Sequence, residues 1–493
     1  MICFFIIFIL FLIKKNSFYF LCCLNINMAS ICTSNVTSAF IDLATFDEIE
    51  KYLYGGPDAT AYFVRETRKS TWFSQVPVVL SRASGSPAFG QEWAVSISRA
   101  GDYLLHTWLR LQTPLVQLLP ANNIGATGRI RWTKNFMHNI IRECCITFND
   151  LVAARFDNYH LDFWAAFTVP AGKRNGYNNM IGNVAGLTNA KIPGTNPGDG
   201  LQPDVLNLPL PFFYSRDSGV ALPTAALPYN EMRINFSFRD WTELLVFENG
   251  DKAGGGEKRQ AITVGKDIAI APTLGITQVW ANYAIVSNDE RKRMACAPRD
   301  ILIEQVQTAP RQNFNPANNT QPTFDVRFSH AIKVLFFSVR NKTWSSEWSN
   351  YMTASPITDN LITIFEPTGS SDPIIQTSLI YENTNRLAQM GSDYFSLVNP
   401  WYHGITIPEE TGYHMYSYSL DFICLDPMGS TNYGKLTNVS IVPEASPAAT
   451  IAANGTGVVN SGADFKQTYD FIVTAINNNV VRVSGGALGF PVL

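Results

Sequence analysis

The stretch Arg216-Asp217-Ser218-Gly219 combines a base, an acid and a hydroxyl, which are residue types found in hydrolytic sites. A serine nucleophile needs a general base within hydrogen-bond reach and donors for the developing oxyanion. Ser218 lies in no G-x-S-x-G elbow, and its flanks, LPLPFF and ALPTAALP, are apolar runs interrupted by proline. The pattern therefore favours a turn held by an ion pair between Arg216 and Asp217 over a catalytic site.

A second group of residues has side chains that could bind a metal ion. These residues are His138, Cys144, Cys145, Asp157 and His160. No two of them have the i,i+4 or tight-loop spacing that is usual for metal ligands. We therefore expect core or surface residues here, and the sequence predicts no catalytic residue, metal or cofactor anywhere in the chain.

Two short basic clusters with neighbouring tryptophans could in principle stack on and neutralise a nucleic acid. The clusters are Arg65, Arg68 and Lys69 near Trp72, and Arg129, Arg131 and Lys134 near Trp132. The whole chain carries a net charge of −3, which argues against bulk nucleic-acid binding. We expect salt bridges between subunits instead. Gly254-Gly255-Gly256 has no lysine-serine at P-loop spacing and is read as a surface loop.

The composition indicates a chain with much buried surface. Only 16% of its 493 residues are charged, against about 25% in average domains. Aromatic residues make up 12%, which favours β structure and large contacts. The length predicts two or three domains. Part of the buried surface is expected to lie against other chains.

The first 27 residues differ from the rest. The apolar run Ile2–Ile13 has 12 residues, fewer than the roughly 18–20 needed to span a bilayer. It lacks a basic n-region and a small-residue cleavage site. Phe, Ile, Leu, Asn and Lys dominate, as in translated AT-rich DNA, so we expect residues 1–27 to be upstream-translated sequence or a hydrophobic extension, with synthesis starting at Met28. A membrane anchor and a cleaved signal are the alternatives.

The cysteines indicate a reducing compartment. The chain has eight cysteines and no C-x-x-C pair, so no zinc or redox motif is predicted. Free thiols are expected at Cys144, Cys145, Cys296 and Cys424.

Strict two-residue alternation, typical of half-buried strands, recurs along the chain. It is seen at Trp93–Ile97, Met232–Phe238, Phe324–Phe328 and Tyr416–Phe422. Asn477-Asn478-Asn479 separates two β-rich runs, as a hairpin turn would. No strand–helix–strand rhythm appears, so two all-β sandwiches in tandem fit best.

Long Gly/Pro/Asn stretches separate the strands, and loops of this length usually contact something. Examples are Gly172–Pro203, Pro310–Pro322 and Asn249–Arg259. The joint between the sandwiches is placed at Asp289–Pro298, which we expect to be ordered and partly buried.

One short helix is predicted at Phe46–Tyr54. Thr45 and Glu48 have the spacing of a capping box, and Gly55 can end the helix. Phe46, Ile49 and Leu53 form an apolar stripe that must dock on something, because nine residues are too few for a stable isolated helix.

Long stretches of the chain resemble the major capsid proteins of nucleocytoplasmic large DNA viruses, most closely the iridovirus branch. The stretch from Leu208 to Phe236 is similar to the family's LPFFF–turn–ALPL signature. The likeness continues through YFVRETRKSTWF, FGQEWAVSISRAGDYLL, GRIRWTKNFMHNIIRECCITFND, DFWAAFTVPAGKRNGYNNMIGN, NDERKRMA and LDPMGSTNYGKLTNVSI. The resemblance covers Met28 to Leu493.

The resemblance implies an all-β fold, a tandem double jelly roll of two eight-stranded β-sandwiches with few short helices. We expect an arm at residues 28–56, a first jelly roll at 57–296 and a second at 297–493. It also implies a structural virion protein that forms homotrimers, pseudo-hexagonal capsomers and an icosahedral shell. Minor capsid proteins and an internal viral membrane are the expected neighbours, with assembly in the host cytoplasm and no direct nucleic-acid contact.

On this interpretation the opening stretch is a structural and assembly signature. Its prolines set corners, Gly219 adopts a positive φ in a turn with Arg216 and Asp217, and its aromatics anchor the sandwich or a neighbouring subunit. The signature residues are Pro209, Pro211, Phe212, Phe213, Arg216, Asp217, Gly219, Pro223, Pro228 and Tyr229. Phe46, Ile49 and Leu53 are the contacts expected of the arm.

Three other functions remain open from the sequence. Jelly rolls with aromatic loops serve lectins, and Trp344, Trp348 and Trp401 would be the sugar-stacking residues. An esterase would use Ser218. A capsid gene captured by a host genome would have the same sequence features as a viral one.

Overall fold

The computed structural model describes residues 35–119, 128–194, 196–248, 261–343, 345–353, 371–455 and 466–490. Residues up to Ser70 form one compact unit and Thr71–Leu493 form another. The predictions for residues 1–27, Asn249–Arg259 and Trp344 lie outside the described residues. In the described ranges no helix is long and apolar enough to span a bilayer.

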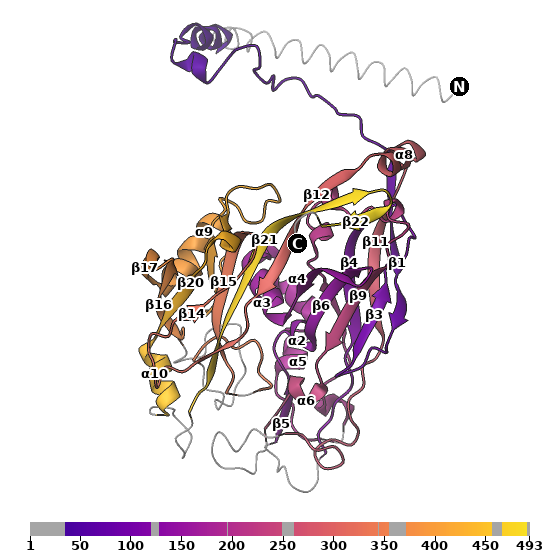
Figure 1. Ribbon diagram of the computed structural model, residues 1–493, viewed down its shortest axis with the longest axis vertical. Coiled ribbons are helices and arrows are strands. Elements are labelled where there is room, and N and C mark those ends of the chain that lie inside the picture. Colours follow the sequence, from indigo (N-terminus) through magenta and orange to yellow (C-terminus); the bar gives the residue numbers. More distant parts are fainter. Residues whose placement is uncertain are drawn as a thin grey trace, which may run out of the picture. The chain divides into compact units, whose positions relative to one another are not determined.

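The first half of the larger unit is a sandwich of two antiparallel sheets (Figure 1). One sheet has the order β1 (Phe73–Val79), β11 (Thr277–Val286), β4 (Tyr103–Gln112), β8 (Val205–Pro209). The other has the order β2 (Ser81–Ser84), β3 (Glu92–Ser96), β9 (Met232–Phe238), β6 (Ile141–Phe148), β7 (Leu151–Phe156). A separate ribbon pairs β5 (Arg129–Trp132) with β10 (Leu245–Glu248).

The second half repeats this architecture. One sheet has the order β12 (Arg299–Thr308), β21 (Tyr469–Ser484), β15 (Ala331–Asn341), β18 (His414–Ser417). The other has the order β14 (Phe324–Asp325), β20 (Val439–Ala445), β16 (Ile374–Tyr381), β17 (Thr384–Gly391). The short strands β13 (Gln312–Phe314), β19 (Thr431–Asn432) and β22 (Ala487–Gly489) extend the first of these sheets.

Both halves have the same strand order once the short extra strands β2, β5, β10, β13, β19 and β22 are set aside. Eight main strands remain in each half, and they form sheets of order 1-8-3-6 and 2-7-4-5. Two four-stranded sheets of this kind make a jelly roll, in which the chain is wound as two Greek keys. The predicted tandem double jelly roll is confirmed.

Short helices connect the strands. The α-helices are α2 (Phe136–Ile140), α3 (Asn158–Thr168), α4 (Ala171–Ile181), α5 (Ala185–Thr188), α6 (Trp241–Leu244), α8 (Asn288–Cys296), α9 (Asn399–His403) and α10 (Pro447–Asn454). The single turns are η1 (Glu50–Tyr52), η2 (Pro197–Asp199), η3 (Phe213–Ser215), η4 (Ser218–Val220), η5 (Thr224–Ala226) and η7 (Tyr433–Lys435), with a π-helical turn at η6 (Tyr394–Val398).

Two loop-forming stretches are ordered in ways that the sequence did not predict. The expected loop Gly172–Pro203 contains α4, α5 and η2. Helix α4 buries only Ile181, so it has no apolar periodicity to reveal it. The expected hairpin at Asn477–Asn479 is wrong, because β21 runs straight through it between β12 and β15. In place of a turn, the Gln307 amide donates a cross-strand bond to Asn477 Oδ1, and the Asn479 amide donates one to Gln305 Oε1.

The alternating strands build two cores. Strand β9 alternates strictly between buried and half-buried residues, and its Phe236 stacks on Trp93 of β3 at 4.8 Å. The second core stacks Phe324 on Phe471 at 4.5 Å. Strand β15 is buried on both faces, since its Phe336 packs into the first core and its Phe337 into the second. The two jelly rolls therefore share a packed layer.

The amino-terminal unit departs from its predicted helix. A helix covers residues 35–44 and the turn η1 follows it, so the expected helix Phe46–Tyr54 is wrong. Thr45 does not cap a following helix, because its hydroxyl donates to the carbonyl of Asp42. Phe46, Ile49 and Leu53 are all exposed. Thr45 instead ends the preceding helix, since its N–H also bonds the Ile41 carbonyl at 3.0 Å.

The joint between the jelly rolls is ordered, and only Glu290 and Met294 of it are half-buried. Helix α8 occupies Asp289–Pro298 almost entirely, but it has no buried residue. It is tethered by Arg291, whose guanidinium donates two 2.8 Å bonds to Asp102. Burial alone would raise the pKa of Asp102, but the hydrogen bonds from Arg291 and the Val286 N–H hold this pKa below its ordinary value.

Candidate functional site

The chemically interesting side chains gather between the two jelly rolls. In the described residues no group of three or more His, Cys, Asp or Glu side chains is placed to hold a metal ion. Arg131, Lys134 and Arg216, which the sequence singled out, instead meet partners from the other jelly roll. The interface between the jelly rolls is therefore the candidate functional site.

Arg216 pairs across this interface and not with Asp217, contrary to the sequence prediction. Its Nε lies 3.1 Å from Glu304 Oε2 on β12, and its guanidinium stacks on Trp164 of α3 at 3.6 Å. Glu304 also accepts a 2.5 Å bond from Lys333 on β15. Asp217 and Ser218 lie exposed on η4. A buried cluster of two cations and one carboxylate thus joins the jelly rolls at the start of the supposed catalytic stretch.

The five candidate metal ligands have separate packing roles. Asp157 caps α3 by accepting a 3.0 Å bond from the His160 N–H, and Cys144 lies in the core, where burial raises its thiol pKa. Cys145 accepts a weak bond from Asn235. The structure does not bring these residues together around one point, so the expectation of core and surface residues is confirmed for them.

The two histidines differ in their surroundings. His138 Nδ1 lies 2.7 Å from Asp162 Oδ1 and its Nε2 lies 2.7 Å from the Tyr177 hydroxyl. His160 is fully buried beside Phe156 and Trp164, and neither ring nitrogen meets a hydrogen-bond partner in the described part of the chain. Burial and the nearby Arg216 lower the pKa of His160 to about 3. His160 is therefore neutral at any physiological pH.

Asp162 of α3 is the polar centre of the interface. It accepts 2.8 Å bonds from the Ser349 and Tyr351 hydroxyls of the second jelly roll. Beside it, Phe163 and Phe167 stack on Phe336 of β15 at 5.8 and 5.4 Å. Helix α3 has no amphipathic pattern in the sequence, because it is buried on nearly all sides and its buried residues include polar ones such as His160 and Asp162; the Asp157 cap was an available signal.

Trp348 is buried between two arginines, which excludes it from the sugar-stacking role. Arg239 and Arg340 lie 3.6 and 3.9 Å from its ring, and its Nε1 donates a 2.9 Å bond to the Glu243 carbonyl. Each guanidinium thus stacks on the indole face, which is a favourable cation–π contact when desolvated.

The second basic cluster serves this interface as well. Arg131 pairs with Glu347 and Lys134 pairs with Glu410, so both bridges run between the jelly rolls of one chain. The expectation that these residues bridge different subunits is wrong for Arg131 and Lys134. The sequence shows that these residues are charged, but it does not show which carboxylates the fold brings close to them.

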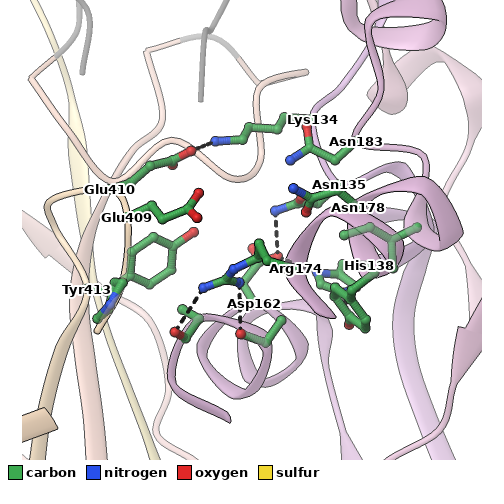
Figure 2. Close-up of a pocket in the computed structure, with 15 residues that line it drawn as sticks. Lys134, Asn135, His138, Asp162, Arg174, Asn178, Asn183, Glu409, Glu410 and Tyr413 are labelled. Atoms are coloured by element: carbon green, nitrogen blue, oxygen red, sulfur yellow. Dashed lines mark hydrogen bonds and ion pairs between the residues drawn. The ribbon is translucent and has the colours of Figure 1, made fainter. Parts of the chain in front are cut away.

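A small polar cavity lies in the interface (Figure 2). Its volume is about 50 Å³, which is room for a few water molecules only. Figure 2 shows Lys134 and Glu410 on one side and Asp162 with Arg174 below. Arg174 donates to the Ala165 and Ala166 carbonyls at the end of α3. The charged and polar side chains around this cavity therefore link the two jelly rolls, and the cavity is too small to hold an organic substrate.

The signature stretch is a scaffold of the first jelly roll. Phe212, Phe213 and Tyr214 are buried in its core, and the Tyr214 hydroxyl pairs with Thr107 Oγ1 at 2.8 Å. Pro223 is buried, whereas Pro209, Pro228 and Tyr229 are exposed and Pro211 is half-buried.

Gly219 differs from its predicted role. It does not adopt a positive φ. An added Cβ would contact only the Asp217 carboxylate, at 3.1 Å. Its carbonyl accepts a 2.8 Å bond from Arg299. The expected left-handed turn at Gly219 is thus wrong, because η4 is a right-handed turn that needs no special residue.

Comparison with known proteins agrees with this architecture. The family described as "Major capsid protein N-terminus" matches residues 61–286, and the family described as "Large eukaryotic DNA virus major capsid protein" matches residues 290–489. Among solved structures, the fold is similar to the PBCV-1 virus capsid (TM-score 0.67, 19% identity, 88% of this chain and 100% of that one). It is also similar to the Faustovirus major capsid protein (TM-score 0.64, 11% identity, 87% and 93%).

Curated relatives are much closer in sequence. The major capsid protein of Costelytra zealandica iridescent virus is 67% identical over 466 residues, which is 94% of this chain and 100% of the relative. That of Invertebrate iridescent virus 6 is 66% identical with the same coverage. That of Frog virus 3 (isolate Goorha) is 46% identical over 470 residues, again 94% and 100%. The chain belongs to the family of major capsid proteins of large eukaryotic DNA viruses.

Proposed function

We propose that this chain is the repeating structural unit of a virion shell, that three copies form a pseudo-hexagonal capsomer, and that capsomers tile an icosahedral capsid. The observation that carries the proposal is that one chain holds two jelly rolls of the same strand order, fixed to each other by buried contacts. Three such chains present six similar blocks, which is the number that a hexagonal tile needs.

The fixed relation of the two jelly rolls supports this role. A tile must keep its shape while its edges bind neighbours, and the Asp162 and Glu304 contacts bury polar groups that only a defined geometry satisfies. Of the residues that first suggested catalysis or metal binding, Arg216 and His138 take part in this packing, whereas Asp217 and Ser218 are exposed. We propose a structural role and no enzymatic one.

Within this unit we propose that residues 28–56 form a linking arm, 57–296 the first jelly roll and 297–493 the second. Phe46, Ile49 and Leu53 would bind minor capsid proteins or the inner face of the capsomer, close to an internal viral membrane. The signature residues from Pro209 to Tyr229 would shape the first jelly roll that these contacts rely on. Assembly would take place in the host cytoplasm, whose reducing conditions suit unpaired cysteines.

Native mass spectrometry and negative-stain electron microscopy of the purified protein test the proposal. We expect trimers with a hexagonal outline. Monomers at all concentrations would contradict it. A monomer with glycan affinity would favour the lectin alternative, for which Trp401, 71% exposed, is the remaining candidate residue. Proteomics of purified particles would separate a viral shell protein from a captured host gene.

A further inference from the structure

The segment formed by η6 and α9 has an apolar face that nothing covers in the described residues. Leu397, Val398, Trp401 and Tyr402 are all exposed, the last two by more than 70%. They lie on one helical segment as two i,i+4 pairs, so they form one continuous surface. Phe395 of the same segment points into the second core. A patch of this kind on a soluble protein usually marks an interaction site.

The repeated topology identifies the counterpart of this segment. Helix α3 directly follows β7, the fifth main strand of the first jelly roll, and η6–α9 directly follows β17, the fifth main strand of the second. Helix α3 covers the outer face of β15, the third main strand of the second jelly roll, through Phe163 and Phe167. The η6–α9 segment has the same place in the topology but no third jelly roll to cover within its own chain.

The outer face of β15, which α3 covers, also has a counterpart in the first jelly roll, and this counterpart is open. The third main strand of the first jelly roll is β4, whose His106 is exposed and whose half-buried Trp108 stacks on Trp280 at 6.1 Å. Beside it lies a cavity of about 710 Å³, within the size range of binding pockets. Its lining is mainly apolar and includes Trp164, Met180, Pro209, Leu210 and Ile423.

The charges of the two surfaces are complementary. The cavity is lined by His106, Lys173 and the Glu304-paired Arg216, and no carboxylate is among the described residues that line it. The η6–α9 segment is preceded by the exposed Asp393. Figure 1 shows α9 at the upper part of the second jelly roll and α4, which lines the cavity with Lys173, Gly176 and Met180, between the two halves, so the two surfaces are separate regions of one chain.

We infer that the η6–α9 face of one copy docks into the cavity beside β4 of the next copy, with Trp401 as its anchor. The contact continues, from chain to chain, the interface that α3 already makes with β15 inside each chain. It is a head-to-tail contact between different surfaces, and such contacts form a ring when the rotation from copy to copy closes, as the proposed trimer requires. The inference rests on the proposed trimer and names the surfaces that hold it together.

Photo-crosslinking tests the placement directly. The photoreactive amino acid p-benzoylphenylalanine replaces Trp401 in the full-length chain, and a matched control carries it at Ile451 of α10, which is also exposed. We expect irradiation of the Trp401 derivative to join chains through peptides that contain His106, Met180 or Pro209. Joined peptides elsewhere, in a protein that is still trimeric, would overturn the inference and leave the proposed function standing.

Paired substitutions test both sides of the contact. Trp401→Asp and Gly176→Trp should each raise the protein concentration needed for trimers by roughly tenfold or more, because the first removes the anchor and the second fills the cavity. An added Cβ at Gly176 meets no atom within 4 Å, so the first atom of the new side chain has room in the monomer. Ile451→Asp and Asn179→Trp, the latter on the same helix outside the cavity, are the controls.

The outcomes separate the two proposals. Normal trimers in both test variants would overturn the inference alone. A wild-type protein that stays monomeric would overturn the trimer and the inference together. Unchanged melting temperatures of the monomeric variants would show that docking, and not folding, was lost, and would support the inference.

Discussion

At the residue scale, the interface between the jelly rolls depends on buried charges that have partners on both sides. Glu304 is the clearest case, because its side chain is 3% exposed and pairs with both Arg216 and Lys333. Removing one member of such a group leaves uncompensated charge in a place that water cannot reach, which costs more than the pair itself contributes.

Glu304→Gln should therefore destabilise the protein by about 3–5 kcal/mol, the usual cost of breaking a buried ion pair. The measurement is the free energy of unfolding from urea titration. Asp300→Asn is the control, since Asp300 is on the same strand and pairs with Arg482 at the surface, where such pairs matter little. An equal loss of unfolding free energy in the two variants would show that water reaches the Glu304 cluster.

His160 predicts a specific pH dependence. Its pKa is about 3 in the folded chain and about 6.5 in an unfolded one. Below pH 6.5 only the unfolded state takes up the proton, so stability present at neutral pH is lost as the pH falls toward 3. The loss from this group is about 1.4 kcal/mol per pH unit.

His160→Phe keeps an aromatic ring between Phe156 and Trp164 but cannot titrate. The difference in unfolding free energy between wild type and variant should be constant above pH 7 and grow in favour of the variant below pH 6. A difference that does not change with pH would mean that His160 is protonated in the folded protein.

At the element scale, short segments are held by one or two contacts each. Helix α8 buries none of its residues, and the Arg291–Asp102 pair is its polar tether. Two glycines of the first jelly roll differ in the space around them. Gly101 lies where a Cβ would approach the Tyr283 Cβ to 2.6 Å, whereas Gly219 has space.

Asp102→Asn should loosen α8 and speed trypsin cleavage after Arg291, Lys292 or Arg293 several-fold, while the rest of the chain stays intact. The tether is lost because the neutral amide cannot accept both guanidinium bonds as a carboxylate does. Timed digestion followed by mass spectrometry provides the comparison. Cleavage of α8 at the same rate in both proteins would show that the pair does not hold the helix.

Gly101→Val should reduce soluble expression or lower the melting temperature, since overpacking a filled core costs about 1–3 kcal/mol. Gly219→Val is the matched substitution on a surface turn and should leave trimers soluble, which reverses what a left-handed turn at Gly219 would require. Loss of soluble protein in Gly219→Val alone would contradict the right-handed geometry of η4.

At the scale of the whole molecule, a repeated fold with a rigid internal joint serves as a tile of a viral shell. A shell component must bind its neighbours, and surface loops commonly carry such contacts. Exposed apolar residues occur in the amino-terminal unit, on η6–α9 and at scattered positions of both jelly rolls.

Deleting residues 28–56, or combining Ile49→Asp with Leu53→Asp, should leave soluble trimers intact and impair shell assembly. The reason is that Phe46, Ile49 and Leu53 are exposed in the described chain and add nothing to either core. Size-exclusion chromatography with light scattering measures the trimer, and electron microscopy of expressed particles measures the shell. An unfolded deletion variant would show instead that the arm belongs to the core.

The sequence by itself determined the fold class, the family and the packing role of the signature aromatics. Two-residue alternation, as in Met232–Phe238, depends on local geometry and burial that any sandwich shares, and long family motifs are specific. The sequence predicted core or surface positions for the His–Cys group, and the structure gives its members separate positions in the fold.

Only the tertiary structure decided which residues meet. Arg216 finds Glu304 rather than its neighbour Asp217, Asn477–Asn479 continue a strand instead of turning, and Lys134 pairs inside the chain. In each case the local preference stabilises one conformation by at most about 1 kcal/mol. Burial between two packed sheets, with partners from distant segments, contributes a larger stabilising free energy. A contact between segments that are far apart in the sequence cannot be predicted from the spacing of residues within either segment.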